Sequence, residues 1–273
     1  MITGQNPALT YSANVTVSAI LLDAGGVLVF PQPEVMLPPL REAGLDVDLA
    51  TLRRAHYWAT SVQDRPNEPP ETPETPETSE PPETPEPPKG TWHPYLVEYI
   101  AACGAAHAGR EELAARMAES IRGHRWTHVA PGVHEALREI AGLGVTLGVV
   151  SNSDGTVEAV LRGLGLCYAC DDTANDGIRE NPEGIQVGVV LDSGVVGIEK
   201  PDPEIFRIAL KALGIPADDT VLYIGDTLRY DVAGALAAGI RPVHLDPHGY
   251  CPAPDGHAHI TSLADLPALA ARP

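Results

Sequence analysis

Short apolar runs recur along this chain, and each of them predicts a buried strand: 15–22, 27–30, 145–150, 186–191, 221–224 and 242–245. Between them, apolar residues recur at spacings of three and four, which predicts helices over 132–143, 156–164, 203–213 and 231–238. A glycine just beyond each helical segment is a typical stop signal. Strands that alternate with helices predict an α/β fold with a doubly wound, mostly parallel, Rossmann-like sheet covered on both faces.

The alternation breaks between residues 32 and 126, where the chain is expected to carry an insertion. Apolar residues at helical spacing predict helices over 42–60, 95–106 and 110–122. We therefore expect a core built from residues 14–31 and 127–273, interrupted by a small helical domain at 32–126.

Within the insertion, residues 64–89 have low complexity, with glutamate at every third position from 68 to 86 and many prolines. Polyproline II has about three residues per turn, so an extended chain would align these carboxylates along one edge. We expect a disordered, acidic and solvated loop. The alternative is a docking tract for a basic protein partner or a proline-recognising module, and nothing else in the sequence supports it.

The composition is acidic, with 18 basic against 37 acidic residues and a net charge of −19. This charge opposes binding to nucleic acid or to an anionic membrane surface, and it favours a cationic cofactor. No apolar run reaches the roughly 18 residues of a membrane span, and the first residues lack the pattern of a signal peptide. We expect a cytoplasmic protein without membrane or nucleic-acid partners.

The four cysteines are too few and too scattered for a disulfide framework. Cys167 and Cys170 have the spacing of redox and zinc sites, which is a weak signal without a second such pair. Four histidines near the C-terminus could in principle surround a metal ion together with Cys251: His244, His248, His257 and His259. Proline and glycine between them favour a surface loop without fixed geometry instead.

Polar residues that could take part in catalysis or metal binding follow the predicted strands. Asp23, Ser151 and Asp226 each come at or just after the end of an apolar run, and the carboxyl ends of parallel strands meet at one edge of a sheet. Lys200 in Glu-Lys-Pro-Asp-Pro and Asp231, in the same motif as Asp226, complete the set. We expect these five side chains to converge on one phosphate and metal site.

The order and context of these motifs resemble the haloacid dehalogenase-like (HAD-like) hydrolase superfamily, most of whose members are magnesium-dependent phosphatases. The resemblance covers about 15–31 and 126–269. It implies that Asp23 is a nucleophile that forms an aspartyl-phosphate and that Lys200 neutralises Asp23 and the transferring phosphoryl group. It also implies that Ser151 and Asn152 hold a phosphoryl oxygen.

The same resemblance implies a Mg²⁺ ion bound by Asp23, by the backbone carbonyl of Gly25 and by Asp226, with Asp231 bound directly or through a water. The insertion would be a cap that excludes water and selects a small phosphorylated substrate. The site would thus combine hard oxygen ligands with the ammonium group of Lys200.

One position departs from the family pattern, because Gly25 stands where the phosphatases usually carry a second aspartate. Its carbonyl can still bind a metal, but the general acid and base is lost, which is typically worth about 10² to 10⁴ in rate. A cap residue such as His56 or Tyr57 is a candidate substitute. The alternatives are a weak or silent member that binds a phosphorylated ligand or a protein partner, and a non-phosphatase hydrolase such as a dehalogenase.

Overall fold

A six-stranded sheet forms the centre of the core in the computed structural model, which describes residues 16–65, 93–121, 126–169 and 184–270. Its strands are β1 (Ala19–Leu22), β4 (Thr146–Ser151), β7 (Val189–Asp192), β8 (Val221–Gly225), β9 (Arg241–Leu245) and β10 (Ala258–Ile260). The order is β10-β9-β8-β1-β4-β7, and all neighbours are parallel. The chain therefore winds away from β1 in both directions, which confirms the predicted doubly wound sheet.

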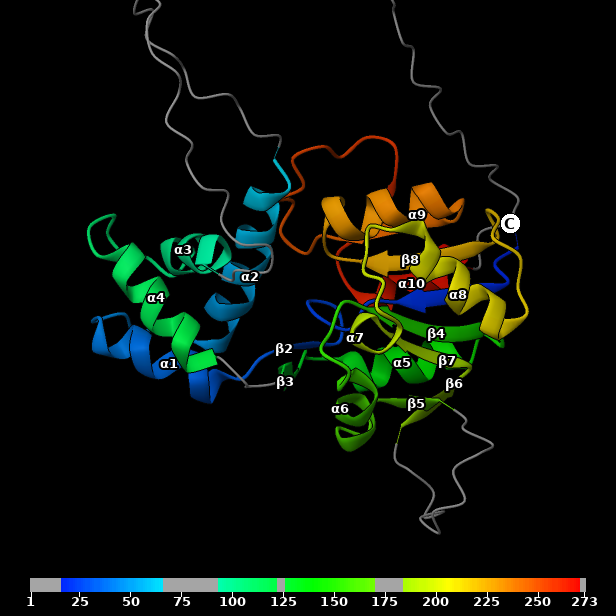
Figure 1. Cartoon of the computed structure of the whole chain (residues 1–273), viewed down its shortest axis with the longest axis horizontal. Helices are drawn as coiled ribbons and strands as arrows, with labels where there is room; N and C mark the ends of the chain where they lie inside the picture. Colours follow the sequence, from blue (N-terminus) through cyan, green and yellow to red (C-terminus); the bar gives the residue numbers. More distant parts are fainter. Residues whose placement is uncertain (1–15, 66–92, 122–125, 170–183, 271–273) are drawn as a thin grey trace, which may run out of the picture.

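Helices cover both faces of this sheet (Figure 1). Ile20 and Leu22 face α5 (Val133–Ala141), α6 (Val157–Gly163) and α10 (Leu266–Ala270) in one hydrophobic cluster. Ala19 and Leu21 face α8 (Pro203–Leu213) and α9 (Ala233–Ala238) in another. Because successive strand residues point to opposite faces and both faces are buried, the strands read as continuous apolar runs.

Several elements differ from the sequence prediction. The run 186–191 forms two strands, β6 (Ile185–Val187), which pairs with β5 (Cys167–Ala169), and β7, which pairs with β4. Gly188 separates them, and a Cβ there would collide with the side chain of Leu213. The predicted helix 231–238 begins earlier, as a π-helical turn η1 (Leu228–Val232) that leads into α9.

The strand β10 was not predicted, because its sequence Ala-His-Ile is short and polar at its centre. His259 on β10 pairs in register with His244 on β9. The expectation of a loop without fixed geometry is therefore wrong for these two histidines. The last part of the chain continues through η2 (Leu263–Asp265) into α10.

The insertion contains four helices in the described residues: α1 (Pro33–Glu42), α2 (Leu49–Gln63), α3 (His93–Ala102) and α4 (Arg110–Ile121). These helices enclose a hydrophobic cluster of their own, in which Met36, Leu96 and Met117 are almost fully buried. The sequence did not predict α1, since Pro38 and Pro39 lie inside it and proline removes a helical hydrogen bond.

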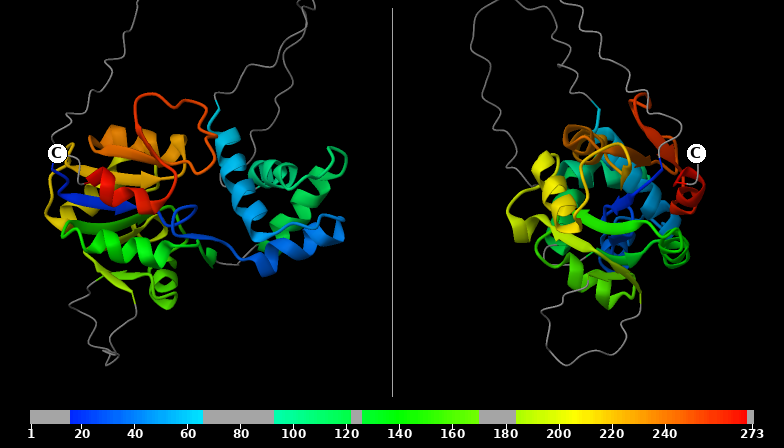
Figure 2. Two further views of the ribbon diagram at one scale, coloured as in Figure 1. Left: turned by 180° about the vertical axis from the view of Figure 1, so that it is seen from behind. Right: turned by 90° about the vertical axis from the view of Figure 1, so that its right-hand side faces the viewer.

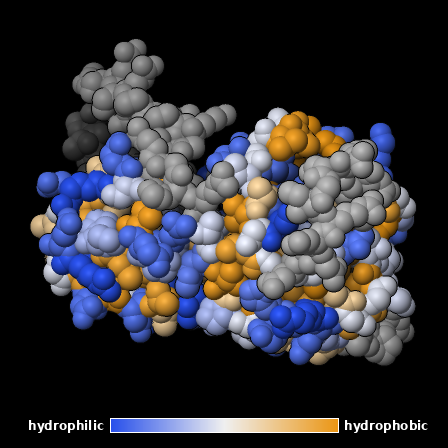
Figure 3. Space-filling model, turned by 90° about the horizontal axis from the view of Figure 1, so that it is seen from below, coloured by the Kyte–Doolittle hydropathy of each residue, from blue (hydrophilic) through white to orange (hydrophobic). Residues whose placement is uncertain are grey.

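A two-stranded antiparallel ribbon connects the cap to the core (Figures 1 and 2). It pairs β2 (Val29–Pro31) with β3 (Trp126–Val129), so the predicted strand 27–30 lies outside the main sheet. Helix α2 lies between the other cap helices and the core. Seen from below, hydrophilic and hydrophobic residues are interspersed over both the cap and the core (Figure 3).

Two expectations from the sequence concern residues that the structure does not describe. Most of the proline-rich and glutamate-rich tract, from residue 66, lies outside the described residues, as does Cys170. Cys167 is buried in β5, and burial raises the pKa of its thiol to about 12. No helix in the described ranges is long and apolar enough to cross a membrane.

Candidate active site

Three aspartates meet at the carboxyl end of the central strands. Asp23 follows β1, Asp226 follows β8, and Asp231 lies in the π-helical turn after it. One carboxylate oxygen from each lies within 4.8 Å of the others, and their residues are 7%, 5% and 1% exposed. The register of β1 with β8 aligns Leu22 with Ile224, so both strands end at the same level and bring the carboxylates together.

The ammonium group of Lys200 lies at the centre of this cluster. Nζ donates to Asp23 Oδ2 at 2.9 Å, to Asp231 Oδ1 at 2.7 Å and to the Tyr223 hydroxyl at 2.9 Å. These bonds use all three donors of the ammonium. Burial alone would lower the pKa of Lys200, but the Asp23 and Asp231 carboxylates raise it above its usual value. Removal of the Lys200 ammonium from these buried carboxylates would lower the free energy of unfolding by on the order of 3–5 kcal/mol.

Burial and the neighbouring carboxylates control the charge of Asp23. Burial raises its pKa, Lys200 lowers it, and Asp231 and Asp226 raise it further, giving a value of about 7. The opposite carboxylate oxygen, Oδ1, accepts a hydrogen bond from the Ala24 N–H at 2.7 Å. Three carboxylates face one ammonium, so with all three ionised the cluster carries an excess of two negative charges. A divalent cation with oxygen ligands fits this donor set.

The carboxylate of Asp231 is fully engaged by protein donors. Oδ1 accepts from Lys200 at 2.7 Å and from the Tyr223 hydroxyl at 2.9 Å. Oδ2 accepts from the N–H of Thr227 at 3.0 Å and from its hydroxyl at 2.6 Å. Burial raises the pKa of Asp231, but Lys200 and these donors lower it overall. This arrangement favours contact with a metal through a water rather than directly.

The other predicted phosphate ligands lie at the end of β4 and just after it. Ser151 ends that strand and is buried. The amide of Asn152 accepts from the Lys200 N–H at 2.8 Å and donates to the Lys200 carbonyl at 3.0 Å. In this arrangement Asn152 positions Lys200.

Sequence reasoning missed Asp192, at the end of β7. Its carboxylate accepts from the N–H groups of Gly155 and Val157, each at 3.0 Å, and so shapes the loop after β4. The signal was present, because Asp192 follows an apolar run as Asp23 does. Tyr223 gave no such signal, since it reads as an ordinary residue of a buried strand.

The cap contributes a histidine to the site. His56 on α2 places Nε2 at 2.8 Å from Asp226 Oδ2 and Nδ1 at 2.9 Å from the Tyr95 hydroxyl. Its ring also makes edge contacts with Phe30 and Trp126, with centroids 5.2 and 5.5 Å apart. Aromatic packing and two hydrogen bonds therefore fix the imidazole beside the carboxylates.

The loop after β1 fits tightly beneath the cap. The Tyr57 hydroxyl donates to the Gly26 carbonyl at 2.8 Å. Gly26 has φ +71°, and a Cβ there would lie 2.5 Å from His56 Nε2 and collide with the Asp226 carboxylate. A glycine at position 26 therefore allows both the turn and the His56 contact.

At Gly25, a Cβ would lie 3.3 Å from two carbons of the Trp126 indole. That ring therefore borders the space into which an aspartate at position 25 would extend. The adjacent carbonyls are occupied, because Ala24 accepts from Leu28 and Gly26 accepts from Tyr57. Among the described residues, no hydrogen bond is made to the Gly25 carbonyl, which is free to bind a metal.

A second contact between cap and core lies at the end of α2. The Asp64 carboxylate accepts from the N–H groups of Leu228 and Arg229, at 2.6 and 2.9 Å. Burial raises the pKa of Asp64 to about 6, although the two N–H donors oppose this shift. Nothing in the sequence around Asp64 predicted this contact.

Comparison with known proteins shows the family and the fold. A family model for haloacid dehalogenase-like hydrolases matches residues 17–239, which is more than half of the chain. The chain belongs to this family. The crystal structure of a HAD phosphatase from Thermococcus onnurineus has the same fold, with a TM-score of 0.50 and 18% identity over 94% of this chain and 99% of that one.

Curated relatives of this HAD-like chain include a phosphoserine phosphatase from Thermus thermophilus, 32% identical over 50% of this chain and 49% of the relative. Another is a phosphoglycolate phosphatase from Rhodospirillum rubrum, 35% identical over 45% of this chain and 43% of the relative. The haloacid dehalogenase-like hydrolase domain-containing protein 3 from Homo sapiens is 34% identical over 52% and 51%. The chain spans about half the length of the curated relatives that it matches.

Proposed function

We propose that this HAD-like hydrolase is a magnesium-dependent phosphatase of a small phosphorylated metabolite, with Asp23 as the nucleophile. The observation that carries the proposal is the buried Asp23 carboxylate, 2.9 Å from the Lys200 ammonium and beside two further carboxylates. The names of the phosphoserine and phosphoglycolate phosphatases support the substrate class.

The donor set supports a Mg²⁺ ion held by Asp23, the Gly25 carbonyl and Asp226, with Asp231 contacting it through a water. When bound, the ion would offset the charge of the carboxylates and of a phosphoryl oxygen. In the chemical step, an oxygen of Asp23 attacks phosphorus, and the bond from phosphorus to the leaving oxygen breaks. Water then cleaves the aspartyl-phosphate, which releases inorganic phosphate and restores Asp23.

Lys200 and the loop after β4 hold the phosphoryl group in this scheme. Lys200 lowers the pKa of Asp23, which favours its ionised form, and gives positive charge to the transferring group. The Ser151 hydroxyl and nearby N–H groups would hold a phosphoryl oxygen, and Asn152 would act by fixing the Lys200 backbone.

The proton for the leaving oxygen is assigned to His56. The cap holds its Nε2 2.8 Å from Asp226, beside the carboxylates of the site. Tyr57 is a poor donor, because burial raises its pKa above the usual value and its hydroxyl is bonded to Gly26. His56 would give a proton to the leaving oxygen and then accept one from the attacking water.

The cap is closed over the site, since Asp23, Asp226 and His56 are all less than a tenth exposed. Substrate binding would require separation of the contacts that His56, Tyr57 and Asp64 make with the core. Closure would then exclude bulk water from the aspartyl-phosphate until hydrolysis.

The direct test is phosphate release from a panel of acyl, aryl and alkyl phosphates, with Mg²⁺ or with EDTA. We expect magnesium-dependent turnover that falls at least about 10³-fold in Asp23→Asn. Asp48→Asn is the matched control, because Asp48 is an exposed helix cap that asparagine can replace. Equal turnover in wild type and Asp23→Asn would overturn the proposal.

The second candidate is a weak or silent member that binds a phosphorylated ligand, and the Trp126 ring beside Gly25 favours it. Turnover only in a Gly25→Asp variant would support this candidate. EDTA-resistant release of halide from haloacids would instead support a dehalogenase. A cytoplasmic location and a protein partner for the proline-rich and glutamate-rich tract stay predictions from the sequence.

A further inference from the structure

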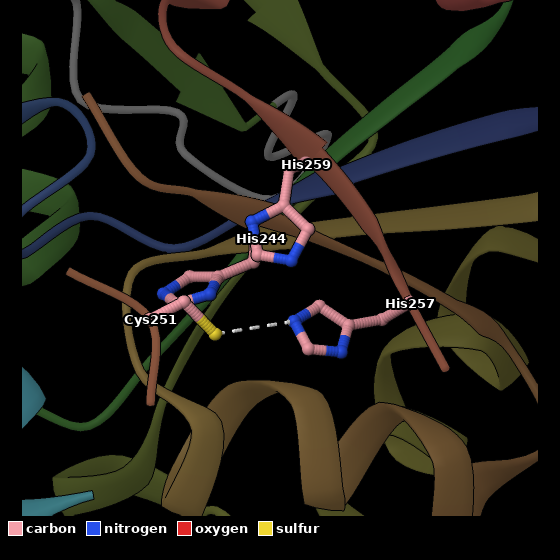
Figure 4. Close-up of side chains that lie close together, drawn as sticks. All are labelled: His244, Cys251, His257 and His259. Carbon is pink, nitrogen blue, oxygen red and sulfur yellow. Dashed lines mark hydrogen bonds between the residues drawn. The ribbon is translucent and has the colours of Figure 1, made fainter. Parts of the chain in front are cut away.

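A second group of metal-ligand side chains lies at the edge of the sheet, apart from the three aspartates. It consists of His244 on β9, Cys251 in the following loop, His257 just before β10 and His259 on β10. One nitrogen or sulfur atom from each lies within 4.8 Å of the others. In Figure 4 the sulfur and the three rings point toward one another. We refer to these four residues as the His/Cys cluster.

The strands position the rings of the cluster. His244 and His259 are direct neighbours in the parallel pairing of β9 with β10. His257 lies two residues before His259, and residues i and i+2 of a strand lie on one face. Three imidazoles therefore share a face at the edge of the sheet, with ring centroids 4.5–5.5 Å apart.

One ring nitrogen of His244 is buried and makes no hydrogen bond to the described residues. The residue is 5% exposed, and the nitrogen without a hydrogen-bond partner is Nδ1. The other ring nitrogen, Nε2, lies 3.2 Å from the Asp226 carbonyl, an acceptor, so Nε2 carries the proton and Nδ1 carries the lone pair. A metal ligand whose second nitrogen donates to a backbone carbonyl is the usual arrangement of histidine in metal sites.

Spacing and charge agree with a metal. Cys251 Sγ lies 3.8 Å from His257 Nε2. In a tetrahedral zinc site, with Zn–S of about 2.3 Å and Zn–N of about 2.0–2.1 Å, sulfur and nitrogen lie about 3.6 Å apart. The carboxylate of Asp246 is 4.0 Å from His259 and is already bonded to the N–H groups of Tyr250 and Cys251. The acidic group beside the three histidines is therefore already engaged by backbone donors.

We propose that His244, Cys251, His257 and His259 bind one Zn²⁺ ion that fastens the loop between β9 and β10. A cysteine thiolate and three imidazoles supply four protein ligands and leave no open position, and structural zinc sites are four-coordinate and tetrahedral in the same way. Binding forms four bonds to the metal and releases the thiol proton of Cys251 to solvent.

The location of the loop gives the ion a structural task. His248 packs against Tyr57, with ring centroids 5.7 Å apart, and Tyr250 packs against Trp58 at 5.4 Å. Tyr57 and Trp58 follow His56 on α2, so the fastened loop supports the helix that closes the site. The ion would also order the Asp226 backbone through His244.

Cobalt substitution tests the proposal on the intact chain. The metal-stripped, reduced protein would be titrated with Co²⁺ in the presence of excess Mg²⁺, and the Co²⁺ then displaced by Zn²⁺. We expect a thiolate-to-cobalt charge-transfer band and the intense d–d absorption of a four-coordinate site. The aspartate site contains no cysteine, so metal bound there gives no such band.

Variants separate the ligands from their surroundings. Cys251→Ser is expected to lose the charge-transfer band, and His257→Asn to weaken zinc binding by at least about 100-fold. His248→Gln, in the same loop but outside the cluster, is the matched control and should bind zinc like the wild type. Zinc should also slow amide hydrogen exchange over 246–258 in the wild type and not in His257→Asn.

The wild-type spectrum decides the question even if a variant fails to fold. A folded wild type without the band would overturn the proposal, as would a band that persists in Cys251→Ser. Zinc affinity unchanged in His257→Asn would also contradict the ligand set.

Discussion

His56 Nε2 lies 2.8 Å from Asp226 Oδ2, although the two residues are 170 positions apart in the chain. One belongs to the cap and the other follows the central strand β8. The pair therefore forms only when the cap is closed. It places a titratable group of the insertion beside the carboxylates of the site, and it links cap closure to the proposed chemistry.

We predict that His56→Gln selectively impairs poor leaving groups. Turnover of alkyl phosphates should fall about 10² to 10⁴-fold, because their leaving oxygen requires a proton in the transition state. Acyl and aryl phosphates should lose much less. The measurement is kcat across the series, with His107→Gln, an exposed cap histidine, as the control. An equal loss for every leaving group would show that His56 acts only by holding the cap.

We predict that Gly25→Asp destabilises the fold, because the Trp126 indole lies 3.3 Å from the added Cβ and must shift to admit the side chain. Overpacking of this kind costs about 1–3 kcal/mol. Trp126→Ala should relieve part of it, so the double variant should lose less free energy of unfolding than the two single losses together. Urea denaturation measures this, with Gly163→Asp as a control at a glycine that has open space. Strict additivity would mean that the indole does not limit position 25.

We predict that Mg²⁺ affinity rises with pH. The pKa of Asp23 is raised from 3.8 to about 7, chiefly by burial, so the metal-free site holds a proton below that value. Metal binding must release this proton, and the apparent affinity should increase up to about tenfold per pH unit below 7 and level off above it. Calorimetric titration at pH 6 and pH 8, in buffers of different ionisation enthalpy, measures both affinity and proton release.

The same shift links stability to pH. A folded state with the higher carboxyl pKa binds more protons than the unfolded chain, so the metal-free protein should lose stability as pH rises from about 4 to 7. Mg²⁺ should restore that stability above pH 7. A Mg²⁺ affinity that does not change between pH 6 and pH 8 would contradict the raised pKa of Asp23.

We predict that Asp64→Ala loosens the cap. The variant leaves the N–H groups of Leu228 and Arg229 without their carboxylate acceptor, at a cost of about 1 kcal/mol or more. Amide exchange at these two positions should therefore be roughly tenfold faster. Mass spectrometry of exchange measures this, and Gln63→Ala, at the exposed neighbouring position, should leave the rate unchanged.

Much of the core follows directly from local sequence. The strands β1, β4, β8 and β9 are short apolar runs buried on both faces, so their pattern does not depend on which strands become neighbours. The same holds for Asp23, Ser151 and Asp226. Their place at strand ends follows from the chain itself, and parallel pairing necessarily brings such ends to one edge.

Other features depend on residues that are distant in the chain. Whether Gly25 faces open space or the Trp126 ring is decided by the ribbon that returns from the cap. The assignment of His56 rather than Tyr57 depends on how α2 rotates over the core, because adjacent helix residues point in different directions. The split of 186–191 into two strands depends on Leu213, which packs against Gly188 from another helix.

The sequence by itself determined the doubly wound core, the helical insertion and the convergence of Asp23 and Asp226, because these follow from hydrophobic periodicity and strand ends. The prediction that Lys200 and Asp231 join them came from the resemblance of their motifs to the family. Only the tertiary structure decided that His56 reaches Asp226 and that three histidines and Cys251 meet. Both depend on packing between separate elements, and a pattern read along one segment contains no information about the partner that packs against it.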